Sequence, residues 1–185
     1  MHQPPAILAV MRKSTSGFTI VELLIVIVVI GILAAITIVA FNGVQQSAND
    51  TRGLQDIASI RKALEQYKVL NGQYPAATNL DTNHASWQAS VNTDTWLTSL
   101  NSVARSLPVD PINDATHLYT YYRSAAGTQG CDPSAGPFYV LVINRLQSRS
   151  GLEVSDNARA TSICTSISAS RTATATRAVF WGFEN

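Results

Sequence analysis

Glu22 is the only ionisable side chain in an otherwise apolar stretch that covers residues 18–41 and reads FTIVELLIVIVVIGILAAITIVAF. A carboxylate within a membrane span costs about 2.5 to 3.5 kcal/mol at the centre and less near the end. Such a residue is therefore a candidate functional residue. A carboxylate and an ammonium group that meet are tolerated in an apolar medium where either alone is costly. The chemistry expected of Glu22 is therefore charge pairing with a cation.

No catalytic centre is indicated elsewhere. The patterns GxSxG, GxGxxG, HExxH and the P-loop are absent, and these carry nucleophilic, dinucleotide, zinc and phosphate chemistry. The three histidines are His2, His84 and His117, and the first precedes the apolar stretch, which disfavours a His-based metal centre. We therefore predict no catalytic residue, no metal and no cofactor. Oxygen ligands occur near one another at Asp110, Asn113 and Asp114, but turn chemistry explains all three.

The apolar stretch is long enough to span a membrane as a helix. Its 24 residues extend about 36 Å at ~1.5 Å per residue, against a hydrocarbon core of about 30 Å. A strand of that length is excluded, whereas a buried core helix remains the alternative. Arg12 and Lys13 precede the stretch and the next cation is Arg52, so we expect a cytoplasmic N-terminus and export of everything after Phe41.

An ordinary secretory signal peptide is a second interpretation of the same stretch. The small residues of Leu33-Ala34-Ala35 resemble a cleavage site, but the apolar run continues to Phe41, beyond the usual 7 to 15 residues or so of such a signal. A carboxylate in the first turns, at Glu22, also disfavours it. We therefore predict that the helix is retained.

The residues before and within the stretch resemble a known processing site. Lys13-Ser14-Thr15-Ser16-Gly17, followed by Phe18-Thr19-Ile20-Val21-Glu22-Leu23-Leu24, is similar to the class III leader of type IV prepilins and type II secretion pseudopilins. The resemblance implies cleavage between Gly17 and Phe18 by a membrane aspartyl peptidase, which also methylates the new amine of Phe18. It also implies an assembly ATPase, a platform protein and other copies of the chain or related pilins as partners. A start at Met11 instead of Met1 would give a shorter leader of the same kind.

The resemblance also assigns a role to Glu22. In this family the carboxylate of an incoming subunit neutralises the terminal amine of its predecessor, here at Phe18, and so sets the axial register. Within one helix, Phe18 and Glu22 are also neighbours at positions i and i+4. An interfacial carboxylate bonded to headgroup water is the simpler alternative.

The sequence after Phe41 predicts that the helix continues and then meets a separate domain. Leu54, Ile57, Ile60, Leu64 and Tyr67 form an apolar stripe at helical spacing, and Asn71-Gly72 with Pro75 ends it. We expect one helix over residues 19–70. The predicted organisation is a leader at 1–17, a membrane and filament-core helix at 18–41, its amphipathic continuation at 42–71 and an exported domain at 72–185.

The exported domain is expected to complete an α+β fold, in which the long helix packs on a small antiparallel sheet. Residues 76–93 are turn-rich, and Asp94 could cap a second helix that ends before Pro108. The strand candidates are 118–123, 138–145 and the tail 167–183, which alternates and is expected to have one solvated side.

Cys131 and Cys164 both fall in the exported part and have no zinc spacing. In an oxidising exterior, a disulfide between them is the simpler prediction, and two buried thiols are the alternative.

Composition narrows the class of function. The net charge of +1 and the pI near 7.8 give no reason to expect nucleic acid as a partner.

The leading interpretation is a structural subunit of a type IV pilus-like filament, which is a single-pass membrane protein before assembly and a surface or periplasmic fibre afterwards. A pseudopilin of a type II secretion or DNA-uptake system is the alternative within the family, although the Gly- and Asp-rich calcium signature of major pseudopilins is absent. A membrane-anchored exported enzyme and a monomeric adhesin are alternatives of other classes.

Overall fold

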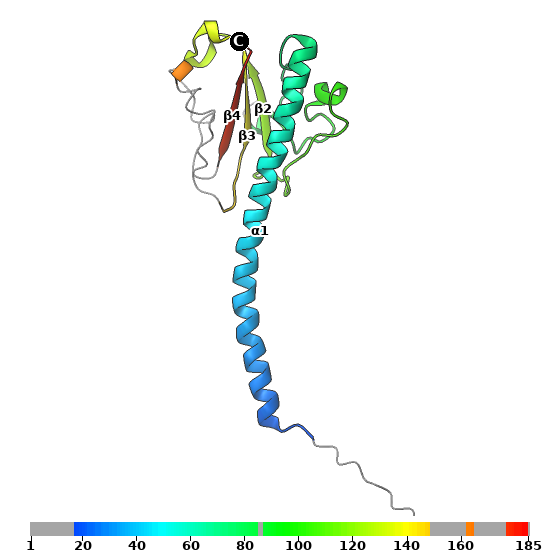
Figure 1. Cartoon of the computed structure of the whole chain (residues 1–185), viewed down its shortest axis with the longest axis vertical. Coiled ribbons are helices and arrows are strands. Elements are labelled where there is room, and N and C mark those ends of the chain that lie inside the picture. Colours follow the sequence, from blue (N-terminus) through cyan, green and yellow to red (C-terminus); the bar gives the residue numbers. More distant parts are fainter. Residues whose placement is uncertain (1–16, 85–86, 149–161, 165–176, 185) are drawn as a thin grey trace, which may run out of the picture. The chain divides into compact units, whose positions relative to one another are not determined.

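The structure is a computed structural model that describes residues 17–84, 87–148, 162–164 and 177–184. Contacts within the chain divide it into two units, Met1–Phe41 and Asn42–Asn185. Helix α1 (Ile20–Asn71) contributes its first part to the first unit and its second part to the second (Figure 1). The predicted helix over residues 19–70 is therefore confirmed to within one residue at each end.

Local sequence explains where α1 ends. Gly72 adopts a left-handed φ of 76°, and its N–H donates to the carbonyl of Lys68 at 2.7 Å. This is the αL termination motif, in which glycine accepts the conformation without steric cost.

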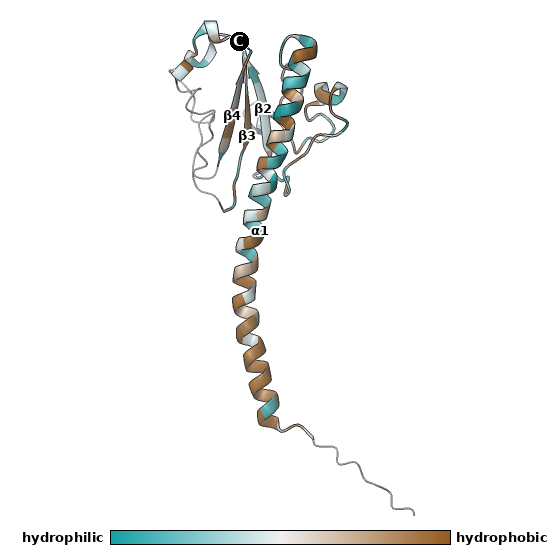
Figure 2. Cartoon of the chain, viewed as in Figure 1, coloured by the Kyte–Doolittle hydropathy of each residue, from teal (hydrophilic) through white to brown (hydrophobic). Residues whose placement is uncertain are grey.

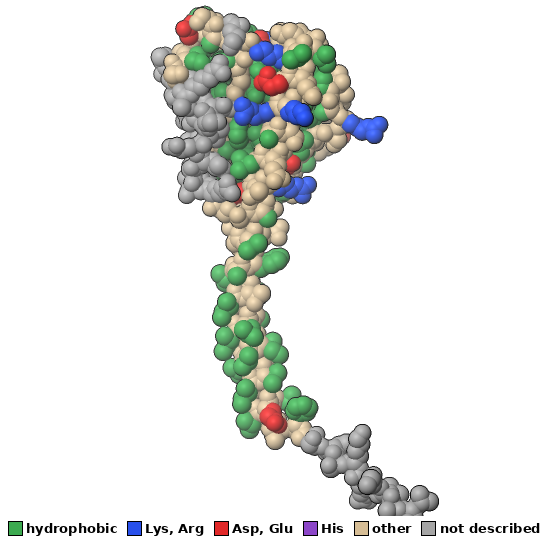
Figure 3. Space-filling view, in the orientation of Figure 1, with side chains coloured by type: hydrophobic (Ala, Val, Ile, Leu, Met, Phe, Trp, Pro, Cys, Tyr) green, Lys and Arg blue, Asp and Glu red, His purple; other side chains and the backbone are tan. Residues whose placement is uncertain are grey.

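In the first unit, the apolar side chains of α1 are not covered by any other described part of the chain. Hydropathy colouring shows almost unbroken apolar character over this part of the helix (Figure 2), and apolar side chains cover the face in view (Figure 3). From Ile20 to Phe41, the large apolar side chains expose between 48% (Val29) and 80% (Ile20) of their surface. Something outside the chain must cover them, because so continuous an apolar surface is unfavourable in water.

The second unit contains a four-stranded antiparallel sheet of order β1-β2-β3-β4. Its strands are β1 (Gln88–Ala89), β2 (Tyr119–Ser124), β3 (Phe138–Ile143) and β4 (Ala178–Phe183). The α+β prediction is confirmed, and the strand candidates at 118–123 and 138–145 match β2 and β3. Of the predicted tail strand, residues 178–183 form β4, whereas residues 167–176 lie outside the described part of the chain.

One face of the sheet packs with the apolar stripe of α1. Ile57, Ile60 and Leu64 are fully buried, with Leu54 and Tyr67 partly buried against the same core, so the predicted stripe is confirmed. Alternate residues of the strands supply the other side of this core: Tyr119, Tyr121, Tyr139, Leu141, Ile143, Ala178 and Phe180.

Both faces of β4 are buried, which corrects the prediction for the tail. Val179, Trp181 and Phe183 of β4 join a second apolar cluster with Phe138 and other residues, and Phe180 lies in the α1 core on the other side. The expected solvated side of this strand was therefore wrong for residues 178–183. The side expected to be solvated carries Ala178 and Phe180, and it is buried because it packs in the same core as Ile57 and Leu64 of α1.

The helix predicted to begin at Asp94 is also wrong. The structure has only a short 3₁₀ helix there, Thr98–Ser102. Leu97 has a φ of 45°, a left-handed conformation that interrupts a right-handed helix. Trp96, Leu97 and Leu100 are nevertheless buried, so their apolar pattern identified core residues correctly and their secondary structure incorrectly.

Gly182 is a position where the sheet requires glycine. A Cβ atom there would lie 2.1 Å from Cε1 of Tyr139, the residue that pairs with Gly182 across β3 and β4 and is fully buried. We expect Gly182→Ala to lower the free energy of unfolding by roughly 2 to 3 kcal/mol, because overpacking a closed core displaces its neighbours. Denaturant unfolding of the full chain in detergent measures this.

Gly43→Ala is the matched control, since a Cβ at Gly43 meets no atom within 4 Å and alanine favours helix. Equal midpoints for Gly182→Ala and the wild type would show that the Tyr139 ring does not constrain this strand.

Candidate functional site

The first candidate site is the segment where α1 begins. Gly17, Phe18 and Thr19 precede the helix. Glu22 Oε2 accepts hydrogen bonds from the backbone N–H of Thr19 at 2.8 Å and from its hydroxyl at 2.7 Å. In return, the N–H of Glu22 donates to Thr19 Oγ1 at 3.2 Å. This reciprocal arrangement is a capping box, with Thr19 as the N-cap and Glu22 three residues later.

The capping box corrects one premise of the sequence analysis. Phe18 is not helical, so it is not a helical i, i+4 neighbour of Glu22 within one chain. Thr19 is the residue that holds the carboxylate, and it does so through Oε2. Both Thr19 donors go to Oε2, and within the described residues no hydrogen bond reaches Oε1 of Glu22.

Gly17 has no structural requirement for glycine within the chain. A Cβ at this position would meet no heavy atom within 4 Å, and its φ is outside the left-handed range that favours glycine. Any requirement for glycine at this position must therefore come from a molecule that approaches its backbone.

The second candidate site is the apolar surface of residues 20–41. This part of α1 is long and apolar enough to cross a membrane, and none of its most apolar window is buried within the structure. Besides Glu22, this surface contains the polar residue Thr37, which donates its hydroxyl to the carbonyl of Leu33 at 2.7 Å and so is satisfied inside the helix. The surface therefore presents apolar groups, and the Thr37 hydroxyl needs no partner outside the helix. Such a surface suits lipid or the apolar helices of other subunits.

In the second unit, Asp50 connects α1 to the chain that follows β3. Its side chain is 3% exposed, and its carboxylate accepts from the N–H groups of Gln147 and Ser148 at 2.8 and 2.7 Å, and from the Ser148 hydroxyl at 2.8 Å. A buried carboxylate needs such donors. Asp50 therefore has a structural role in this unit.

The C-terminal end of β4 is held by a second polar cluster. Arg123 donates from Nε and Nη2 to the two carboxylate oxygens of Glu184, at 2.8 and 3.1 Å. Glu184 also accepts from the N–H of Tyr74 at 3.0 Å, and Lys68 donates to the carbonyl of Phe183 at 3.2 Å. These bonds tie the last strand to β2 and to the end of α1.

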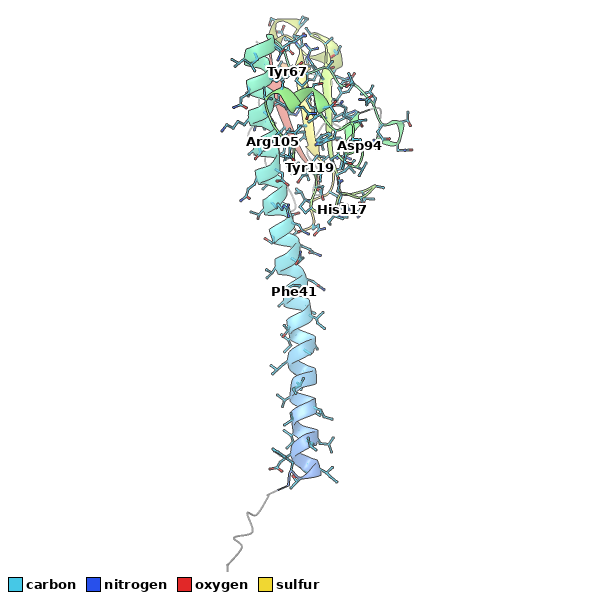
Figure 4. The ribbon with its side chains drawn as sticks, turned by 90° about the vertical axis from the view of Figure 1, so that its right-hand side faces the viewer. Phe41, Tyr67, Asp94, Arg105, His117 and Tyr119 are labelled. Carbon is cyan, nitrogen blue, oxygen red and sulfur yellow. A yellow bond between two sulfur atoms is a disulfide. The ribbon has the colours of Figure 1, made fainter. Side chains whose placement is uncertain are left out.

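Two buried tyrosines of this unit, Tyr74 and Tyr119, act as hydrogen-bond donors. Tyr119, seen beside α1 in Figure 4, donates to Asp56 at 3.0 Å, and Tyr74 donates to Glu65 at 2.7 Å. Burial, reinforced by the neighbouring carboxylates, raises the pKa of both phenols well above the usual value. Burial likewise raises the pKa of Asp56. Burial is the main cause of all three shifts, and the hydrogen bond from Tyr119 opposes it at Asp56.

The oxygen-rich turn at residues 110–117 matches the turn chemistry expected from the sequence. Asp110 accepts from the N–H of Ile112 at 2.9 Å. Asp114 accepts from the N–H groups of His117 and Thr116, each at 2.7 Å, and these bonds lower the pKa of its carboxyl. Within the described ranges, no group of three or more His, Cys, Asp or Glu residues is placed to hold a metal ion.

Cys131 and Cys164 form a disulfide that joins residues 33 apart in the sequence. Both cysteines are buried in the second apolar cluster, where Trp87 also lies. The bond attaches the segment at 162–164 to the chain that precedes β3.

Two residues of these sites were missed by the sequence analysis. The T-x-x-E pattern of Thr19 and Glu22 is a recognised capping signal and could have been identified. Asp50 gave no such signal, because a lone acid in the polar segment after Phe41 looks like a solvated residue.

Comparisons with known proteins match both parts of the chain. A family profile described as the prokaryotic N-terminal methylation motif matches residues 12–38, and a profile described as type II secretion system, protein G, matches residues 41–132. The chain is 31% identical to the type II secretion system core protein G of Pseudomonas aeruginosa over 120 residues. This alignment covers 64% of this chain and 80% of that protein.

Other relatives match over shorter regions. The core protein G of Aeromonas hydrophila is 36% identical over 64 residues, and that of Vibrio cholerae is 38% identical over 65 residues. Each alignment covers 35% of this chain and less than half of the relative, 45% and 44% respectively. No solved structure matches the chain.

The disulfide gives a direct test of this part of the structure. We expect unreduced, denatured protein to show no reactive thiol and reduced protein to show two, by mass after alkylation. Replacing both cysteines with serine should lower the free energy of unfolding by about 3 to 4 kcal/mol, from the length of the closed loop. Two reactive thiols before reduction would contradict the bond.

Proposed function

We propose that this chain, which belongs to the type II secretion system protein G family, is a structural pseudopilin that is trimmed, stored in the membrane and polymerised into a filament. The observation that carries the proposal is the uncovered apolar surface of residues 20–41, with Glu22 as its only acid. Lipid can cover this surface before assembly, and the same helices of other copies can cover it afterwards.

Processing is the first step of the proposed function. A prepilin peptidase cuts the Gly17–Phe18 bond and methylates the new amine of Phe18. The leader of 17 residues leaves a mature chain of 185 − 17 = 168 residues. The structure supports this step because Gly17 and Phe18 lie outside the helix and a Cβ at Gly17 would meet open space.

Assembly is the second step. The new ammonium group of Phe18 is costly in an apolar surrounding, as is the carboxylate of Glu22, so pairing between copies stabilises both. Thr19 occupies only Oε2 of Glu22, which leaves Oε1 for the amine of a neighbouring copy. The chain exchanges lipid for other apolar helices, so removal from the membrane requires little change in apolar contact.

The comparisons favour a secretion filament over the type IV pilus that the sequence analysis placed first. The three relatives described above are each named as a type II secretion system core protein G. We therefore assign the chain to that system, with an assembly ATPase and a platform protein as partners. The N-terminus lies in the cytoplasm and residues after Phe41 are exported. The chain acts as a building element and not as an enzyme.

Intact-mass and N-terminal analysis of membrane-extracted protein tests the proposal. We expect a chain that begins at Phe18 and carries one additional methyl group on its amine. Gly17→Ala is expected to keep the fold, since a Cβ there meets no atom, and to block cleavage because the enzyme must approach that backbone closely.

A mature chain that begins near Ile36 would instead indicate an ordinary signal peptidase and would refute the pseudopilin assignment. Efficient cleavage of Gly17→Ala would contradict the role given to that glycine.

A further inference from the structure

We propose that Thr19 is a positioning residue for leader cleavage: its capping box with Glu22 starts α1 at Ile20 and so keeps the Gly17–Phe18 peptide bond out of the helix. The inference rests on the proposed function, since it concerns how this chain presents the bond that is cut. It assigns Thr19 a role that the charge pairing of Glu22 does not require.

The geometry defines the boundary sharply. Thr19 contributes three groups to the box, because its N–H and hydroxyl both donate to Glu22 Oε2, and its hydroxyl oxygen accepts from the Glu22 N–H. Its carbonyl accepts the first helical bond, from the N–H of Leu23 at 3.2 Å. With these bonds made, the N–H of Thr19 is committed to the cap and Phe18 lies before the helix.

The position of this boundary matters because a protease binds its substrate as an extended segment. Peptide groups in an extended segment are open to pair with the enzyme, as in strand addition. A peptide group within a helix is committed to its own turn and shielded by side chains. Without the cap, the long apolar helix can gain a residue at its start, since propagation adds one bond for each residue fixed.

The surroundings of Gly17 support the same conclusion. A Cβ at Gly17 would meet no atom within 4 Å, so the chain places nothing against the backbone on the leader side of the bond. On the other side, the cap keeps Phe18 and Thr19 out of the helical turns. Together, the open surroundings of Gly17 and the fixed start of α1 leave the Gly17–Phe18 peptide bond exposed.

The cap is not needed to keep α1 helical. The helix has 52 residues and a continuous apolar surface, so loss of one cap leaves the rest of it helical in a membrane. The expected effect is therefore on the fraction of chains that present an extended bond. A smaller competent fraction weakens apparent substrate binding and leaves the later chemical step unchanged.

The test uses the full, uncut chain in detergent with a prepilin peptidase, and follows cleavage by intact mass. Thr19→Val keeps the shape and removes the hydroxyl. We expect it to raise KM by up to about fivefold with little change in kcat, because fivefold is the limit set by the usual worth of one cap, about 1 kcal/mol. Thr19→Ser restores a hydroxyl and should return KM close to the wild-type value.

Thr37→Val is the matched control, because it removes another hydroxyl of the same helix, whose bond goes to the carbonyl of Leu33. It should be cleaved like the wild type. Amide exchange of residues 17–20 in the uncut chain provides the second readout, and Thr19→Val should gain protection at these positions.

The outcomes separate the two proposals. If the wild type is not cut between Gly17 and Phe18, both the proposed function and this inference fail. If the wild type is cut there but Thr19→Val has the same KM, or gains no amide protection, the inference alone is overturned. A raised KM for both Thr19→Val and Thr19→Ser would also overturn it, because the hydroxyl would then not be the cause.

Discussion

The constraint on which the account depends is an apolar helical surface that its own chain leaves uncovered. Residues 20–41 of α1 expose about half or more of every large apolar side chain, without a preferred face. Water is a poor solvent for such a surface, whereas a bilayer and a bundle of like helices are both good ones. A subunit that must be stored in one medium and used in another needs a surface that both accept. Glu22 is the one acidic group on this surface, and only the bundle of like helices offers it the Phe18 amine of another copy as a partner.

In the second part of α1, the apolar stripe packs within the chain instead of being exposed. Ile57, Ile60 and Leu64 are fully buried against the sheet, and Asp50 is satisfied by backbone donors after β3. Arg123 and Glu184 hold the last strand in place. These polar groups of the second unit thus serve its own fold. One helix therefore supplies a closed core in one unit and an open surface in the other.

The sequence was most informative where one local signal dominated. The apolar stretch, the stripe from Leu54 to Tyr67 and the Gly72 stop each follow from helical spacing or backbone conformation, and the structure agrees with all three. It was less informative where distant segments decide. The left-handed Leu97 broke a helix that the apolar spacing had favoured, and packing in the α1 core buried the face of β4 that was expected to be solvated. At the candidate site, Glu22 was recognised and its partner Thr19 was overlooked.

In the assembled filament, Glu22 is expected to pair with the Phe18 amine of another copy. The direct measurement is solid-state NMR on filaments mixed from two preparations, one with ¹⁵N at the Phe18 amine and the other with ¹³C at the Glu22 carboxyl. A dipolar coupling between the two labels in the mixed filaments, at a distance of about 4 Å as for an ion pair, is the predicted result. A coupling that appears only when both labels are in the same chain, or none at all, would contradict pairing between subunits.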